Sequence, residues 1–323
     1  MSTPLRSEEL ASVSVRPMRE PDLVEARRIF RVAFATFVGA PDPESFRADR
    51  EYVFTRWRAD PGGSLAAEAN GSLAGSNFAT NWGSFGFFGP LTVRPELWNQ
   101  HIARSLLVST MDLFEKWKVR EAGLFTFAHS PKHIGLYQKF GFWPRFLTAI
   151  MSKDVNKRDA SSTKYSSLNE HDRAEVLSAC RKLTDSIHEG EGLDVTSEIR
   201  SVRDQNLGET ILMWGGDSLD AFAVCHCGEG TEAGKNTCYV KFAAVRPGPG
   251  AENNFDRLLD SCEALAAERG LRRMEAGVNL GRSGAYRHML QRGFRTEIQG
   301  VAMHKPDSAA YNRPDVFVLD DWR

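Results

Sequence analysis

The sequence contains an internal repeat, and this feature limits most strongly what the chain can fold into. Three short motifs recur at one constant shift of 152 residues, and no gap is needed between 93–153 and 245–305. A long repeat that keeps its register predicts two copies of one fold. The recurring motifs are Val93-Arg94-Pro95 with Val245-Arg246-Pro247, Leu106-Leu107 with Leu258-Leu259, and Gly141-Phe142 with Gly293-Phe294.

Hydrophobic periodicity predicts the same order of elements in both halves. The first half begins with a strand and two helices, of which the second helix is expected over 46–58. Asn70-Gly71 is a strong hairpin signal between strands 64–69 and 72–82. A third strand over 85–93 contains Gly89-Pro90, which predicts a bulge. The first half continues with helix 99–117, strand 122–128, helix 131–140 and strand 142–151. The expected counterparts in the second half are helices 172–188 and 197–206, strands 210–214, 221–227 and 238–245, helix 252–269, strand 273–278, helix 284–291 and strand 294–303.

The length of 323 residues also favours two domains, because a single hydrophobic core rarely grows that large. The stretch 156–163 is polar and rich in Ser and Thr, as linkers are. We therefore divide the chain into a first domain at 1–155, a linker at 156–163 and a second domain at 164–323 that ends in a C-terminal tail. The fold class is α+β, in which each domain is a mixed, mostly antiparallel sheet flanked by helices.

Charge and composition narrow the function classes. The 41 Lys and Arg residues nearly balance the 42 Asp and Glu residues, whereas a dedicated nucleic-acid binder would show a basic surplus. The sequence has no apolar run of 18 residues and no signal-like start, so neither a membrane span nor secretion is expected. Five cysteines in a long chain are typical of reduced thiols. We expect a cytoplasmic protein without nucleic-acid or membrane partners, and a homodimer remains open.

A group of thiols in the second half raises the question of zinc. Cys225 and Cys227 share one face of a predicted strand, and Cys238 is expected on a neighbouring strand. His226 points to the opposite face, so the three thiols lack an evident fourth ligand. We interpret them as buried thiols and expect no metal.

The junction that follows Val93 has the features of an anion site. Pro95 ends the strand, and a helix begins within 97–103. Such a junction directs free backbone N–H groups and the positive end of a helix dipole at one place, which suits a pyrophosphate. Further along, Leu136-Tyr137 and Gly141-Phe142 mark a short helix that ends at Gly and is followed by a strand.

With these motifs the chain resembles, twice over, the GNAT family of acyl-CoA-dependent N-acetyltransferases. The family's loop reads roughly V-x-P-x-x-(Q/R)-x-x-G-x-(G/A), and here Trp98 replaces Gln or Arg, His101 replaces the first Gly, and Ala103 fits. The resemblance implies acetyl-CoA as co-substrate. The residues that it implies for binding are Leu91, Val93, Trp98, Asn99, Gln100, His101, Ile102, Ala103 and Arg104.

The resemblance also suggests catalytic residues. Tyr137 falls where such enzymes place the Tyr that protonates the departing CoA thiolate. His129 follows the strand 122–128 and is a candidate base, because His titrates near neutral pH. In the second half the Tyr position is Met289, Phe255 takes a Gly or Ala position, and Glu252 puts an anion where phosphates would lie. We interpret that half as a non-catalytic copy.

These inferences favour an N-acetyltransferase that moves an acetyl group from acetyl-CoA to an amine by direct attack. The acceptor stays open between a small molecule and a peptide. Two alternatives of another class also stay open. One is a non-catalytic acyl-CoA sensor or binding module, and the other is a structural protein that binds no CoA.

Overall fold

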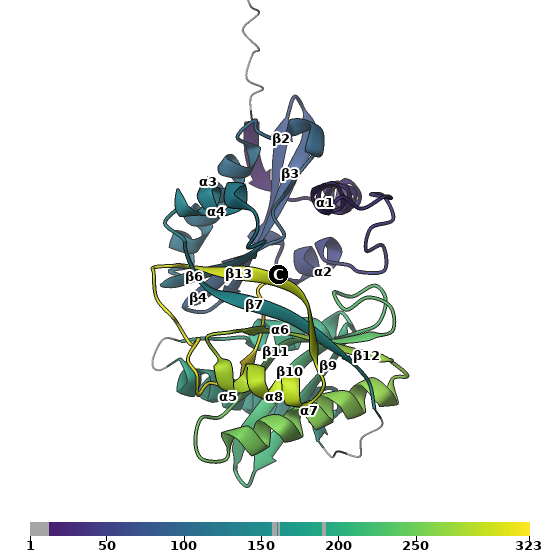
Figure 1. The fold of residues 1–323 in the computed structure, drawn as a ribbon, viewed down its shortest axis with the longest axis vertical. Helices are drawn as coiled ribbons and strands as arrows, with labels where there is room; N and C mark the ends of the chain where they lie inside the picture. The colour runs from purple at the N-terminus through teal and green to yellow at the C-terminus, as the bar shows by residue number, and fades with distance from the viewer. Residues whose placement is uncertain (1–12, 157–159, 161, 189–191) are drawn as a thin grey trace, which may run out of the picture.

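The structure is a computed structural model that describes residues 13–156, 160, 162–188 and 192–323. Four of the eight positions of the expected linker at 156–163, namely 157–159 and 161, lie outside the described residues. Figure 1 shows two α+β halves stacked along the long axis, with strands crossing the middle between them. The expected fold class is confirmed, because the strands form a mixed parallel and antiparallel sheet with helices packed on it.

The elements of the first half follow the sequence pattern with two differences. The helix expected at 46–58 begins only at Val53, and the strand expected at 85–93 is broken at Gly89-Pro90. The elements are β1 (Val13–Pro17), α1 (Leu23–Val38), α2 (Val53–Ala59), β2 (Ser64–Ala69), β3 (Ser72–Trp82), β4 (Phe85–Phe88), β5 (Thr92–Val93), α3 (Ile102–Lys116), β6 (Glu121–Thr126), α4 (Pro131–Gln138) and β7 (Trp143–Asp154).

The second half keeps the repeat in register. The elements β6 and β12 begin at Glu121 and Arg273, a difference of 152 residues, and α4 and α8 begin at Pro131 and Ser283 with the same difference. The elements are β8 (Thr163–Lys164), α5 (Glu170–Ile187), α6 (Thr196–Asp204), β9 (Gly208–Gly215), β10 (Ser218–Cys227), β11 (Thr237–Val245), α7 (Ala251–Glu268), β12 (Arg273–Asn279), α8 (Ser283–Gln291), β13 (Arg295–Lys305) and β14 (Val318–Leu319).

Each half contributes its last long strand to the other. The strand β13 lies between β6 and β7, with Met303 opposite Leu124, while β7 pairs with β12. Figure 1 shows β7 and β13 crossing the middle of the molecule. One sheet therefore runs through both halves. The division at 155 describes the repeat in the sequence, and strand pairing continues across it.

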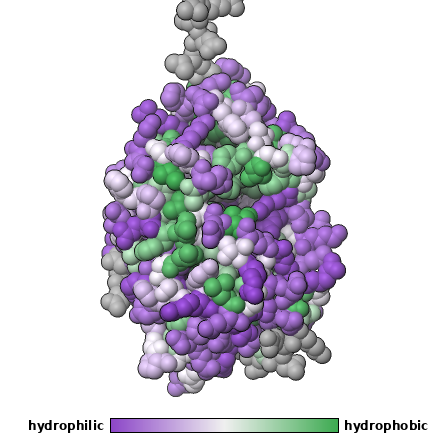
Figure 2. Space-filling model, viewed as in Figure 1, coloured by the Kyte–Doolittle hydropathy of each residue, from purple (hydrophilic) through white to green (hydrophobic). Residues whose placement is uncertain are grey.

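Helices cover both faces of the sheet because strand side chains alternate between the faces. In β2, Leu65 and Ala67 pack beneath α3, whereas Ala66 packs with Phe30 of α1. Apolar residues also gather across the middle of the space-filling view in Figure 2, at the height where β7 and β13 cross in Figure 1. This arrangement leaves α1 and α3 on opposite sides of the strands that form the candidate site.

Candidate active site

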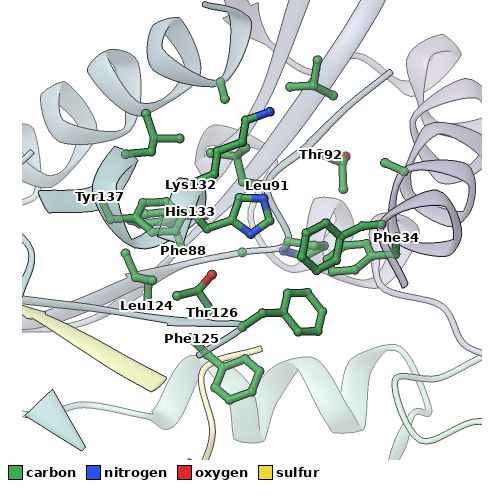
Figure 3. A pocket seen from close by; sticks show the side chains of 18 of the residues that line it. Phe34, Phe88, Leu91, Thr92, Leu124, Phe125, Thr126, Lys132, His133 and Tyr137 are labelled. Carbon is green, nitrogen blue, oxygen red and sulfur yellow. The ribbon is translucent and has the colours of Figure 1, made fainter. Parts of the chain in front are cut away.

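A cavity opens in the first half where two parallel strands diverge. The strands β4 and β6 pair from Phe85 with Glu121 to Phe87 with Gly123, after which β5 pairs with β3 instead. The cavity enters this gap and has a volume of about 850 Å³. Figure 3 shows Phe88 and Tyr137 on one side of it and Phe34 on the other. A volume of this size is typical of small-molecule sites.

The loop before α3 forms one end of this cavity. Of the residues that the resemblance implied for acetyl-CoA binding, all except Gln100 line it. Asn99 and His101 adopt left-handed backbone conformations, with φ of 69° and 65°, a region that Gly enters most easily. His101 therefore keeps the loop conformation at a position where the family pattern has Gly. The loop also closes on itself, because Trp98 donates its indole N–H to the carbonyl of Val93 at 2.8 Å.

Positive charge surrounds this end of the cavity. No acidic residue stands in the first turn of α3, and its N-cap residue His101 makes no side-chain cap. Lys132 of α4 lies over the Trp98 ring, 5.8 Å from its centroid, and Arg104 and Lys139 also line the cavity. Free N–H groups and cations favour a diphosphate. Lys132 and Lys139 did not enter the sequence prediction, although their place at the two ends of the helix that follows β6 was a usable signal.

Tyr137 lines the cavity from the last turn of α4. Its side chain is 8% exposed, and its ring lies 5.8 Å from that of Phe88. Burial raises the pKa of the Tyr137 phenol to about 12, partly offset by a hydrogen bond with Thr126. The phenol therefore carries its proton at neutral pH and can supply it.

Two histidines lie near the same wall. His129, the base candidate from sequence, is not among the residues that line the cavity, and its ring stacks on Phe37 at 6.0 Å. His133 does line the cavity, and its ring lies 4.8 Å from that of Phe37. Burial and, to a lesser degree, the neighbouring Lys132 lower the pKa of His133 below its ordinary value. A neutral imidazole in the wall can accept a proton.

The opposite end of the cavity is largely aromatic. None of the described residues that line the cavity is Asp or Glu. This end is formed by rings from α1, from the segment before α2, from the end of β6 and from the C-terminal segment. It therefore suits an apolar or aromatic group. These rings belong to Phe30, Phe34, Phe37, Phe46, Tyr52, Phe127 and Trp322.

In the second half the corresponding gap is filled by the chain itself. The strand β11 is unbroken, and it pairs with β12 only from Thr237 to Val240. Beyond that point β14 pairs with β11, Leu319 lying opposite Ala243. Phe317 covers the start of α7, its ring 5.3 Å from that of Phe255.

A buried ion pair holds this C-terminal segment in place. Arg282 is 1% exposed and donates to the carbonyl of Val318 and to the carboxylate of Asp320, both at 2.8 Å. The sequence predicted only a tail after the last strand, 294–303, and gave no sign of this role.

Four of the five cysteines form two close pairs in the second half. The sulfur atoms of Cys225 and Cys262 lie 3.9 Å apart, as do those of Cys227 and Cys238. Within the described residues, no group of three or more His, Cys, Asp or Glu side chains is placed to hold a metal ion.

The helices that the structure describes include none long and apolar enough to span a membrane.

Comparison with known proteins agrees with this geometry. Residues 25–142 match the model of the acetyltransferase (GNAT) family. A proposed acetyltransferase from Pyrococcus horikoshii has a TM-score of 0.67 at 13% identity, and the match covers 100% of this chain and 98% of the other. A GCN5-related N-acetyltransferase from Sphaerobacter thermophilus has a TM-score of 0.58 at 16% identity, with coverage of 91% and 95%.

A tandem GNAT protein from the clavulanic acid biosynthesis pathway also shares the fold, with a TM-score of 0.56, 12% identity and coverage of 91% and 98%. No curated protein sequence matches the chain. The family match covers the first half, and the fold of the whole chain is similar to that of a tandem GNAT protein. This chain has a domain of the GNAT acetyltransferase family in its first half, and the resemblance inferred from the motifs is confirmed.

Proposed function

We propose that the first half transfers an acetyl group from acetyl-CoA to an amine. The observation that carries this proposal is the open gap between β4 and β6, with the α3 loop at one end and Tyr137 in the wall. The second half then acts as a non-catalytic copy, since β14 occupies the equivalent gap. The family match supports acyl transfer in general, and acetyl-CoA is the donor that the family implies.

The N–H groups at the start of α3, with Lys132 and Arg104, hold the diphosphate of the donor. Backbone N–H groups of the segment 88–93 polarise the thioester oxygen. The amine nitrogen attacks the carbonyl carbon, so that a C–N bond forms and the C–S bond breaks. Tyr137 gives its proton to the leaving thiolate, and His133 accepts the proton that the amine loses.

The acceptor is an amine carried on an apolar or aromatic body. The rings at the far end of the cavity, Phe34 and Phe37 among them, would contact that body. Without a lining Asp or Glu side chain, the described part of the cavity offers little to a polyamine. Phenethylamine is therefore expected to react faster than spermidine.

Substitution of Tyr137 tests the proposal. Tyr137→Phe keeps the ring and its packing and removes the acidic proton, so kcat is expected to fall by about 10²- to 10⁴-fold. The affinity for acetyl-CoA is expected to stay constant, because the proton acts only on charge that develops in the transition state. CoA release with phenethylamine measures kcat, and calorimetric titration measures the affinity.

The matched control is Tyr286→Phe on α8, the corresponding helix of the second half, and it is expected to keep the parent rate. Full activity of Tyr137→Phe would remove the named acid. Tight acetyl-CoA binding without turnover on any amine would favour the acyl-CoA-binding module instead, an alternative that agrees with the absence of Asp and Glu among the described lining residues.

A further inference from the structure

A second cavity of about 440 Å³ lies between the two halves, and we call it the interface cavity. Its walls come from α2 and β3 of the first half and from α6, β10 and β11 of the second. Small-molecule sites often lie between domains and have volumes of this order. Its ionisable lining residues are Arg56, Asp60, Arg181, Asp194, Glu198, Arg200, His226, Glu232 and Lys241.

The repeat relates the interface cavity to the acceptor end of the first cavity. Lys241 stands 152 residues after Gly89 (241 minus 89), and Gly89 lines the first cavity whereas Lys241 lines the interface cavity. The helices α5 and α6 take the places of α1 and α2 in the element order. Because β14 fills the neighbouring gap, the second half keeps a counterpart of the acceptor end without room for a thioester.

The buried charges of the interface cavity neutralise one another. Glu232 is 1% exposed and accepts from Arg56 and from Lys241, both at 2.8 Å. Lys241 also lies 3.6 Å from Glu198. The rim adds the pair Arg181 and Asp194 at 2.5 Å. With Arg200 and Asp60 included, four cationic side chains face four anionic ones, so the walls match a ligand without net charge.

His226 is the group that this network leaves unsatisfied. It is 2% exposed and lines the cavity, and neither ring nitrogen has a hydrogen-bond partner among the described residues. Burial, and then the nearby Lys241, lower the pKa of His226 to about 3, so the ring is neutral and offers one donor and one acceptor. A buried polar group left without a partner destabilises the folded protein, and a bound ligand that bonds to the group recovers this cost.

From the balanced charges and the unpartnered His226, we propose that the interface cavity binds a small zwitterion of the α-amino-acid class. Arg200 at the rim can hold its carboxylate, Asp60 can hold its ammonium, and His226 bonds a polar side-chain group. Arg56 also donates to the carbonyl of Gly89 in the wall of the first cavity, so one guanidinium separates the two sites.

Calorimetric titration of the full chain tests this proposal, with L-glutamine and L-serine as probes and succinate and putrescine as charged comparisons. We expect one amino acid bound per chain and no saturable binding of the dianion or the diamine. His226→Phe is expected to weaken amino-acid binding at least about tenfold, because both hydrogen bonds are lost. It is also expected to melt no lower than the parent, because an unsatisfied polar group is removed.

His226→Gln, which retains a donor and an acceptor, is expected to restore part of the affinity. The exposed His171→Gln on α5 serves as the control and is expected to bind like the parent. The proposal is overturned if neither amino acid binds, if His226→Phe binds them unchanged, or if succinate or putrescine binds equally well. Acetyl-CoA titrated into the same samples reports separately on the first half, because His226 does not line its cavity.

Discussion

Each half has a gap between two equivalent parallel strands, but the gap is open in the first half and filled in the second. In the first half the strand breaks at Gly89-Pro90 and the gap stays open as a cavity. In the second half β11 continues to Val245 and β14 fills the gap. Both copies keep parallel pairs at the shift of 152, Phe85 with Glu121 and Thr237 with Arg273. A repeated sheet can therefore keep its register while only one copy keeps an open site.

The helix starts beside the two gaps also differ, both in backbone conformation and in the charge of the first turn. The α3 start has a left-handed N-cap at His101 and no acid in its first turn. The α7 start has Glu252 in its first turn, and Phe317 packs on its buried Phe255. A left-handed conformation costs an L-residue roughly 1–2 kcal/mol, so His101 maintains a strained loop. This strain occurs at the helix start that lines the open cavity.

The largest effect is expected from removing the ion pair that holds the filled gap closed. Arg282→Ala leaves the buried Asp320 carboxylate without its cationic partner, and the loss of one charge of a buried ion pair destabilises a protein by about 3–5 kcal/mol. Urea denaturation measures the free energy of unfolding. Arg287→Ala, exposed on the same helix, is the control and is expected to change it by less than about 0.5 kcal/mol.

A double variant at the same ion pair tests whether the unpaired charge causes the loss of stability. Arg282→Met combined with Asp320→Leu is expected to recover most of the loss, since no unpaired charge remains. A loss below about 1 kcal/mol in Arg282→Ala would mean that the C-terminal segment is not a fixed part of the second half.

An effect of intermediate size is expected from adding a carboxylate to the helix start beside each gap. Ala103→Glu places a carboxylate beside the site proposed for the diphosphate and is expected to weaken acetyl-CoA binding by about 10- to 100-fold, because like charges repel across a few ångströms. Asn253→Glu, in the first turn of α7, is expected to leave the affinity unchanged. Calorimetric titration with acetyl-CoA measures both, and the opposite pattern would mean that the second half holds the donor.

The smallest effect is expected from His133, whose counterpart at the shift of 152 is Ala285. The imidazole accepts a proton only when neutral, and its pKa is lowered, so kcat should rise with pH along a limb below about 6.5 and then level off. Tyr137, with a pKa of about 12, should keep the plateau flat to about pH 10. Aniline is the suitable acceptor, because its nitrogen is unprotonated at neutral pH.

His133→Gln is expected to remove this limb and to lower the plateau by about tenfold, less than the full range for a general base because water can take the proton. His129→Gln is the matched comparison. A limb that disappears with His129→Gln and survives His133→Gln would restore the base candidate that the sequence suggested.

Local sequence signals determined much of the fold. Asn70-Gly71 predicted the hairpin, and the shift of 152 predicted where the later elements of the second half begin. Gly89-Pro90 predicted a bulge at the position where the structure breaks the third strand. The same motifs pointed to the α3 loop and to Tyr137, both of which line the cavity. The predictions of secondary structure held because a turn residue, a missing N–H or a helix start acts within a few residues of itself.

The joining of the two copies, and the choice of the copy that keeps an open cavity, depend on contacts that no local signal predicts. The strands β7 and β13 have equivalent positions in the repeat, so no local signal shows that Met303 pairs with Leu124 of the other half. The same holds for the packing of Phe317 and Val318 into the second gap, and for the choice of His133 over His129 in the cavity wall. These features arise from contacts between distant residues, and such contacts form only when the whole sheet is assembled.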